Sequence, residues 1–124
     1  MADKDDVSTT VINRRRGDLP KTALPPGLRG CLRFMDGPDK GRVAYLDKPI
    51  NALGRHTDND VKLSDSAASS HHAVIFFAQS LDWRIEDVGS TNGTLLNGAQ
   101  VSQYALRDGD KIVVGDNLLV FSVD

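Results

Sequence analysis

The sequence lacks the features that mark several large classes of protein. Its one cysteine, Cys31, excludes an intramolecular disulfide, and its apolar neighbours predict a small buried residue. The chain has no run of about 18 apolar residues and no charged-then-apolar leader. We therefore expect neither a transmembrane helix nor a secretory signal, which indicates a cytoplasmic location and no membrane partner.

The charge distribution argues against nucleic acid as a partner. The 124 residues fit one domain, and the formal net charge is −2. Residues 1–29 contain six basic and four acidic side chains, whereas residues 30–124 contain nine basic and thirteen acidic ones. An acidic body does not attract a phosphate backbone. The basic cluster Arg14-Arg15-Arg16 is interpreted as a solvated patch or a kinase docking site.

The chain divides into an irregular leader and a β-rich body. Residues 1–29 show little periodicity and end near Pro25-Pro26-Gly27, which predicts a disordered regulatory tail with a stiff hinge. From Gly30 onward, short β-like runs alternate with turn residues, and no segment has sustained helical periodicity. Residues 30–124 are therefore predicted to form an all-β domain, a two-sheet antiparallel β-sandwich of about ten to eleven short strands.

The expected strands are runs of apolar and β-branched residues bounded by turn residues. The residues 72–78 and 82–87 predict a hairpin, and Asn97-Gly98 is a strong two-residue turn signal. The expected strands cover 30–35, 42–46, 49–54, 59–63, 72–78, 82–87, 94–96, 99–101, part of 106–115, and 117–123.

Three turn-like stretches carry side chains that suit an oxyanion. They are Gly54-Arg55, the tetrad 69–72 and the run Gly89–Thr94, whose Gly, Ser, Thr and Asn residues favour tight, internally hydrogen-bonded connections. A phosphate is bound well by an Arg that bonds two oxygens and by hydroxyl and backbone N–H donors. The candidate phosphate-binding residues are Arg55, Ser69, Ser70, Thr91 and Asn92.

The order of these motifs resembles that of the forkhead-associated (FHA) domain. The resemblance covers about residues 30–124 and rests on four motifs in this order: Gly54-Arg55, Ser69-Xaa-Xaa-His72-Ala73, Gly89–Thr94 and Asn97-Gly98. It implies an FHA/SMAD-like sandwich with its recognition loops at one end, and a phosphothreonine-containing protein as partner. It also suggests similarity to bacterial FHA signalling proteins.

The resemblance implies a role for each residue of the motifs. Arg55 and Ser69 would bond the phosphate, and Thr91 and Asn92 would line the pocket for the phosphothreonine methyl group and hold the peptide backbone. His72 would support its loop from inside, and Asn97 would support the loop Gly89–Thr94 from behind. The glycines that would shape the backbone are Gly54, Gly89 and Gly93.

Ser70 departs from the family pattern. Many FHA domains carry Arg, Lys or Asn immediately after the phosphate-binding Ser. A hydroxyl can donate a hydrogen bond but brings no charge, so we expect either a lower affinity or a contribution from another residue, such as His71.

An enzyme would need to use the same Ser and His residues differently. Ser69 lies on no strand-to-helix elbow and has no separate His and acid at motif positions. A metal site on His56, His71 and His72 is disfavoured because adjacent residues of an extended segment point to opposite faces. We therefore expect a binding module without catalytic residues, metal or cofactor. The alternative is an FHA sensor fragment of a larger signalling enzyme, such as a nucleotide cyclase, that binds a phosphorylated partner in trans.

The leader contains candidate phosphorylation sites. Some bacterial FHA proteins carry a Thr-Thr motif in the N-terminal tail, and Thr9-Thr10 is similar in placement. A Ser/Thr protein kinase would modify Thr9 or Thr10, and the chain's own tail would then bind its own domain. If the linker Val11–Arg29 is flexible, its root-mean-square span is about 25 Å, which permits docking in cis. The third residue after Thr9 is the apolar Ile12, which favours Thr9, whereas the family pattern favours Thr10.

Overall fold

The structure, a computed structural model, describes residues 16–124 and consists almost entirely of β-strands. A single turn of 3-10 helix, η1 (Arg16–Asp18), precedes the strands in the described part of the chain. The strands are β1 (Gly30–Asp36), β2 (Val43–Leu46), β3 (Ile50–Gly54), β4 (Val61–Lys62), β5 (Ala73–Phe77), β6 (Trp83–Asp87), β7 (Thr94–Leu96), β8 (Ala99–Gln100), β9 (Gln103–Ala105), β10 (Lys111–Val114) and β11 (Asn117–Val123).

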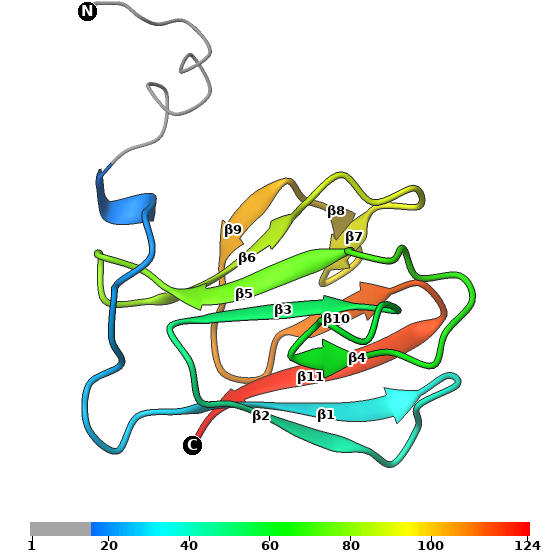
Figure 1. The fold of residues 1–124 in the computed structure, drawn as a ribbon, viewed down its shortest axis with the longest axis horizontal. Helices are drawn as coiled ribbons and strands as arrows, with labels where there is room; N and C mark the ends of the chain where they lie inside the picture. Colours follow the sequence, from blue (N-terminus) through cyan, green and yellow to red (C-terminus); the bar gives the residue numbers. More distant parts are fainter. Residues whose placement is uncertain (1–15) are drawn as a thin grey trace, which may run out of the picture.

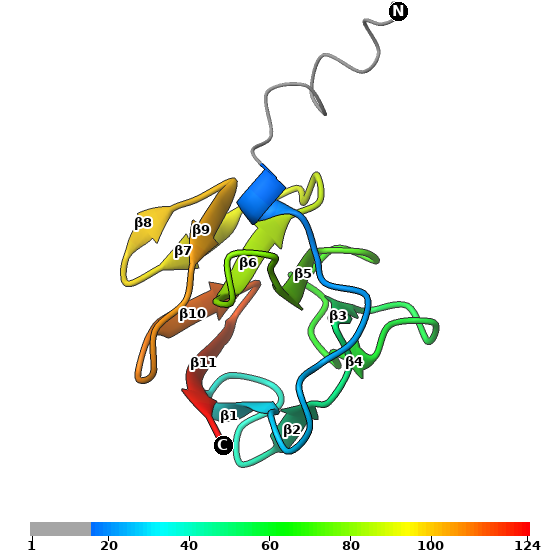
Figure 2. The same cartoon turned by 90° about the vertical axis from the view of Figure 1, so that its left-hand side faces the viewer.

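The strands form two sheets that face each other, as Figures 1 and 2 show. One sheet has the order β2-β1-β11-β10-β7-β8 and the other the order β4-β3-β5-β6-β9. This confirms the predicted all-β sandwich of about eleven strands. The pairing is antiparallel as predicted except at one edge, where β4 pairs parallel with β3. There the loop turns back on itself, and the carboxylate of Asp60 accepts the N–H of Ala52 at 2.8 Å, as a strand partner would.

The core lies between the sheets and follows the alternation of each strand. Trp83 makes edge contacts with Phe77 and Phe121, at centroid distances of 5.4 and 6.1 Å. Cys31 is buried, as predicted. Burying each large apolar side chain contributes about 1.5–3 kcal/mol. Both sheets contribute to the core cluster, which includes Leu32, Phe34, Leu53, Ile75, Ile85, Ile112, Val114 and Leu119.

Residues 16–29, which we call the strap, pack against the domain. The N–H of Lys21 donates to the carbonyl of Phe77 at 2.8 Å, and the carbonyls of Leu19 and Gly17 accept from residues 79 and 80 at 2.7 and 3.0 Å. Figure 1 shows η1 beside the β5–β6 hairpin. Farther along the strap, Leu24 and Leu28 pack against the core.

The prediction of a disordered tail up to residue 29 is therefore wrong for the strap. The strap bonds the β5–β6 hairpin through backbone groups, with an isolated bridge between Pro20 and Ala78. Backbone contacts of this kind do not require alternating side chains, so the sequence pattern did not indicate them. Thr9 and Thr10 lie outside the described residues. The boundary proposed between residues 29 and 30 lies within the segment 16–124 that the structure describes without a gap.

The sequence patterns also missed β9. This strand has three residues, none of them buried, and lies at a sheet edge beside β6, so neither its length nor an alternating pattern marks it. Within residues 16–124, no helix is long and apolar enough to span a membrane.

Candidate functional site

The three oxyanion-type stretches meet at one end of the sandwich. They lie in the β3–β4, β4–β5 and β6–β7 connections, which Figure 1 places at the end opposite the β5–β6 hairpin. The N–H of Arg55 donates to the carbonyl of Ser69 at 3.1 Å, and the N–H of Thr91 donates to Ser69 Oγ at 2.9 Å. Asn92 Nδ2 reaches the carbonyl of Ala67 at 3.0 Å. The three loops are therefore joined by hydrogen bonds, and together they carry Arg55, Ser69, Thr91 and Asn92. Ser70 lies next to Ser69 in the same connection.

Arg55 is exposed and oriented by the β4–β5 connection. Its Nε donates to the carbonyl of Ala68 at 2.6 Å, and it lines a hollow of about 310 Å³ with residues 62–66. Within residues 16–124, the hydrogen bonds of this side chain use Nε alone, which leaves Nη1 and Nη2 available as donors. The carboxylates nearest in sequence are engaged elsewhere, since Asp58 pairs with His56 and His71 and Asp60 pairs with Lys48.

His72 joins the loops from inside the domain. It is fully buried; the N–H of Ser69 donates to its Nδ1 at 3.0 Å, and its Nε2 lies 2.9 Å from the carbonyl of Gly93. A carbonyl only accepts, so Nε2 carries the proton and Nδ1 is the acceptor. The imidazole is therefore neutral, and it holds the Ser69 and Gly93 backbones at a fixed separation. Ser69 Oγ retains its own proton for a ligand while accepting from Thr91.

Two glycines are required by the geometry of these loops. A Cβ on Gly54 would lie 2.2 Å from the carbonyl oxygen of Ser70, so any side chain would push the β4–β5 connection away from β3. Gly93 has φ +85° and a Cβ there would lie 2.9 Å from the Gln100 side chain. Both positions were predicted as backbone devices, and the structure supplies the close approaches that explain them.

Asp87 organises the β6–β7 loop and was not among the predicted residues. Its Oδ1 accepts the N–H groups of Gly89 and Ser90, each at 2.9 Å, and its Oδ2 accepts the hydroxyls of Ser90 and Thr94. Partial burial alone would raise the pKa of Asp87, but these hydrogen bonds outweigh it and hold the pKa below its usual value. The signal in the sequence is the acid two residues before Gly89, which is typical of an Asx turn.

Two buried polar residues that the predictions also missed brace the other loops. Asn59 Nδ2 donates to the carbonyls of His56 and Ser70 at 2.9 and 2.8 Å, which ties the β3–β4 loop to the β4–β5 connection. Asp65 is buried and accepts the N–H of Asp116 at 2.7 Å, which fixes the connection to the β10–β11 turn. The partners that join separate loops, Ser70 for Asn59 and Asp116 for Asp65, are remote in sequence, so no local pattern reveals these roles.

Asn97 does not support the Gly89–Thr94 loop, contrary to the expectation. Its Nδ2 donates to Asp110 at 3.0 Å and its Oδ1 accepts the N–H of Lys111 at 2.9 Å. It has φ 50° and Gly98 has φ 88°, as a tight hairpin turn requires. The physical reason is that the β7–β8 turn lies against the start of β10, far from the β6–β7 loop along β7.

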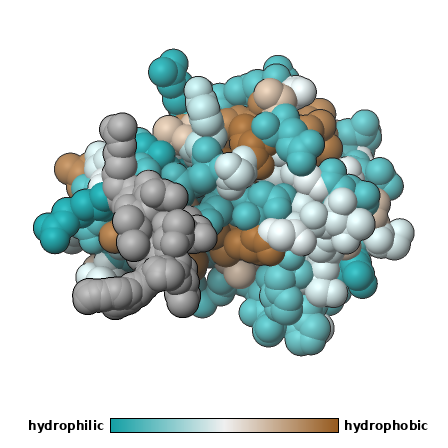
Figure 3. Space-filling model, turned by 90° about the horizontal axis from the view of Figure 1, so that it is seen from above, coloured by the Kyte–Doolittle hydropathy of each residue, from teal (hydrophilic) through white to brown (hydrophobic). Residues whose placement is uncertain are grey.

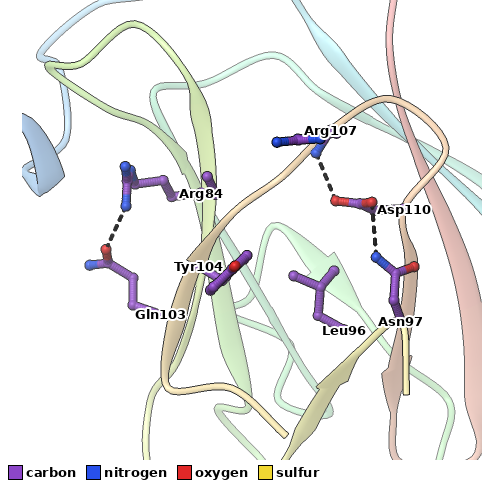
Figure 4. A pocket seen from close by; sticks show the side chains of 8 residues that line it. Arg84, Leu96, Asn97, Gln103, Tyr104, Arg107 and Asp110 are labelled. Carbon is purple, nitrogen blue, oxygen red and sulfur yellow. Dashed lines mark hydrogen bonds between the residues drawn. The ribbon is translucent and has the colours of Figure 1, made fainter. Parts of the chain in front are cut away.

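A cavity of about 580 Å³ lies away from the recognition loops, between β9 and the β7–β8 turn (Figure 4). Several of its polar groups already have partners within the chain. Arg84 bonds Gln103 and pairs with Asp18 and Asp82, and Asp110 accepts from Asn97 and from the N–H of Arg107. Figure 3 shows the side above β6 and β9 as mostly hydrophilic, with separate hydrophobic patches. This cavity carries no predicted binding residue other than Asn97.

The family model of the FHA domain matches residues 51–115. The glycogen accumulation regulator GarA of Mycobacterium tuberculosis (strain H37Rv) is 39% identical over 98 residues, which cover 79% of this chain and 59% of GarA. The oxoglutarate dehydrogenase inhibitor of Corynebacterium jeikeium is 39% identical over 105 residues, which cover 80% of this chain and 72% of the inhibitor. The chain thus spans about three fifths of the length of GarA. Both relatives are regulatory proteins by name rather than enzymes.

Solved structures have a fold similar to that of this chain. A structure from work on phosphothreonine-dependent FHA domain interactions has a TM-score of 0.69 and 32% identity, and it covers 76% of this chain and 95% of its own. Mycobacterium tuberculosis EmbR in complex with a low-affinity phosphopeptide has a TM-score of 0.69 and 27% identity, covering 94% of this chain and 28% of EmbR.

Proposed function

The chain belongs to the FHA-domain family, and we propose that its recognition loops bind phosphothreonine-containing peptides in Ser/Thr kinase signalling in the cytoplasm. The observation that carries this proposal is the hydrogen-bonded junction of Arg55, Ser69 and Thr91, whose loops come from three separate connections. EmbR, a structural relative, has been solved with a phosphopeptide. The chain acts as a binding module in this proposal, not as an enzyme.

Each residue has a defined task in this proposal. Arg55 presents Nη1 and Nη2 to two phosphate oxygens, while the hydroxyls of Ser69 and Ser70 donate to the remaining lone pairs. Thr91 and Asn92, both exposed, contact the methyl group and the peptide backbone. A filled methyl contact is worth about 0.8 kcal/mol, which favours phosphothreonine over phosphoserine.

Titration of a phosphothreonine peptide into the full chain tests the proposal. Arg55→Ala should weaken binding by roughly 10- to 150-fold, because a charge-assisted hydrogen bond is worth about 1.5–3 kcal/mol. Arg33→Ala is the matched control, since Arg33 is an exposed Arg on β1 that bonds Ser122. Retained affinity in a folded Arg55→Ala protein would overturn the assignment of the site.

The proposal includes a regulatory step, in which a Ser/Thr kinase phosphorylates Thr9 or Thr10 and the site then binds the chain's own tail. The strap changes the geometry of that step. The carbonyl of Gly17 is bonded to Ser80, at the end of β5 that lies farthest from Ser70. Thr10 precedes Gly17 by seven residues, which span at most about 25 Å when fully extended.

The path to the site is about as long as this tether. If the backbone from Ser70 to Ala78 were extended throughout, its eight residues would rise by roughly 26 Å at about 3.3 Å per residue, and phosphorylation at Thr9 instead of Thr10 would add only one residue, about 3.6 Å, to the tether. A tether this short would have to be straight and fully extended to reach the site. The residues that follow the phosphothreonine would then all be used to span the distance, and none could contact the domain. We therefore propose that docking in cis requires the strap to leave the β5–β6 hairpin. Release as far as Leu24 would lengthen the tether to 14 residues, at most about 50 Å when fully extended.

A further inference from the structure

His56, Asp58 and His71 converge from two loops beside the recognition site. Asp58 Oδ1 lies 2.7 Å from His56 Nδ1 and 3.0 Å from His71 Nε2, and the candidate ligand atoms all lie within 4.8 Å of one another. The two imidazole rings are stacked, with centroids 5.5 Å apart. The sequence argued against a metal site on His56, His71 and His72, and His72 is indeed buried and bonded to Ser69 and Gly93, but Asp58 takes its place beside the other two rings.

The backbone around this cluster is already ordered. The N–H of His56 donates to the carbonyl of Ser70 at 3.1 Å, and the buried Asn59 bonds the carbonyls of both residues. The two loops are therefore tied together immediately beside the three side chains. A ligand that joins these side chains would not have to order the loops, which lowers the entropic cost of binding.

Two imidazole nitrogens and one carboxylate oxygen form a donor set that Zn²⁺ and similar ions prefer. In a tetrahedral zinc site with bonds of about 2.0–2.1 Å, ligand atoms lie about 3.3 Å apart. The two separations from Asp58 Oδ1, 2.7 and 3.0 Å, would open by a few tenths of an ångström, and the two imidazole nitrogens, which lie within 4.8 Å of each other, would adjust to the same spacing. We propose that His56, Asp58 and His71 bind a divalent transition-metal ion, with a fourth position open to solvent because all three side chains are exposed.

The metal would change the charge next to the recognition loops. Neutral imidazoles and one carboxylate carry a charge of −1, and a divalent cation makes the cluster +1. His56 directly follows Arg55, and His71 directly follows Ser70, the position that supplies no charge of its own. The bound cation would therefore favour a dianionic phosphate at the neighbouring site. The metal site itself does not depend on the proposed function.

Calorimetric titration of the full chain with Zn²⁺ alone, in a buffer that does not bind metal, tests this inference. We expect saturable 1:1 binding, weakened at least tenfold by Asp58→Asn and by His71→Gln. Asp60→Asn is the matched control in the same loop, because Asp60 pairs with Lys48 and lies outside the cluster. Co²⁺ should give a visible absorption band that both cluster variants lose.

The histidine ring resonances provide a second readout that does not depend on stability. Zn²⁺ should shift the signals of His56 and His71 and leave those of the buried His72 in place. Binding should also weaken in acid, because protons compete with the metal for the ligand atoms. Undiminished affinity in Asp58→Asn, or the absence of saturable binding to the wild-type chain, would overturn the proposal.

Discussion

The two ends of the sandwich are held by different kinds of hydrogen bond. At the recognition end, side chains that include His72, Asp87 and Asn59 bond to backbone groups of neighbouring loops. At the hairpin end, the strap bonds the β5–β6 hairpin mainly backbone to backbone. The recognition end is therefore sensitive to single side chains, whereas the hairpin end depends on whether one segment stays in place.

The largest effect is expected from locking the strap. An ideal Cβ on Gly17 lies 3.3 Å from Ser80 Cβ, close to the roughly 3.5–4.5 Å of a disulfide, so Gly17→Cys with Ser80→Cys should cross-link the two elements. In the reduced, tail-phosphorylated protein, a tail at about millimolar effective concentration should weaken binding of an added phosphopeptide by roughly a hundredfold. Oxidation should restore that binding, because the locked tail is too short to compete.

The unphosphorylated, oxidised protein is the control for the lock experiment. If it fails to bind the added peptide, the binding function itself is wrong. If the phosphorylated protein stays blocked after oxidation and remains monomeric in sedimentation, the tail reaches the site without release of the strap. A concentration-dependent dimer in the oxidised form would instead indicate exchange of tails between two copies, and docking in cis would be rejected.

Replacing one glycine at each end should reveal the difference in packing. Gly54→Ala places a methyl group 2.2 Å from the Ser70 carbonyl and should cost about 1–3 kcal/mol of unfolding free energy. Gly17→Ala meets only Ser80 Cβ at 3.3 Å and should change stability by less than about 0.5 kcal/mol. Urea denaturation measures both, and equal midpoints would contradict the contrast.

Asp87→Asn should destabilise the recognition end by about 1–2 kcal/mol at neutral pH, since it removes the charge that its hydrogen bonds favour. The folded pKa of Asp87 is lowered, so its stabilising effect is complete above the unfolded value near 3.8 and is lost as the pH falls through the folded pKa. The difference in stability from wild type should therefore shrink in acid. Asp116→Asn, at an exposed position, is the control, and a difference that grows below pH 4 would refute this role.

The smallest effect is expected at the strap's ion pair. Asp18 and Arg84 are 3.2 Å apart and partly exposed, so Asp18→Asn should cost no more than about 1 kcal/mol. It should raise hydrogen exchange at the amides of Gln79 and Ser80, whose acceptors lie in the strap, and leave the amide of Thr91 unchanged. Equal changes at both ends would show that the strap does not open independently.

The candidate binding residues could be predicted because they form short motifs with local turn chemistry. Arg55, Ser69 and Thr91 were placed together by resemblance, and the structure shows the hydrogen bonds between their loops. Of the residues that hold these loops, His72 was expected from the resemblance and Asp87 has a local turn signal, whereas Asn59 and Asp65 were missed because their roles depend on remote partners. Asn59 and Asp65 acquire their tasks only where the β4–β5 connection meets the β3–β4 loop and the β10–β11 turn.

The features that the sequence alone determined are those that depend on residues close together in the chain. Alternation, β-branched runs and turn residues indicate the sandwich and most of its strands, because side-chain direction and positive φ are set within a few residues. Folding decided the strap, β9, the parallel β3–β4 pair and the partner of His56 and His71. Each of these depends on hydrogen bonds or side chains that meet only when distant segments pack together, so no local pattern encodes them.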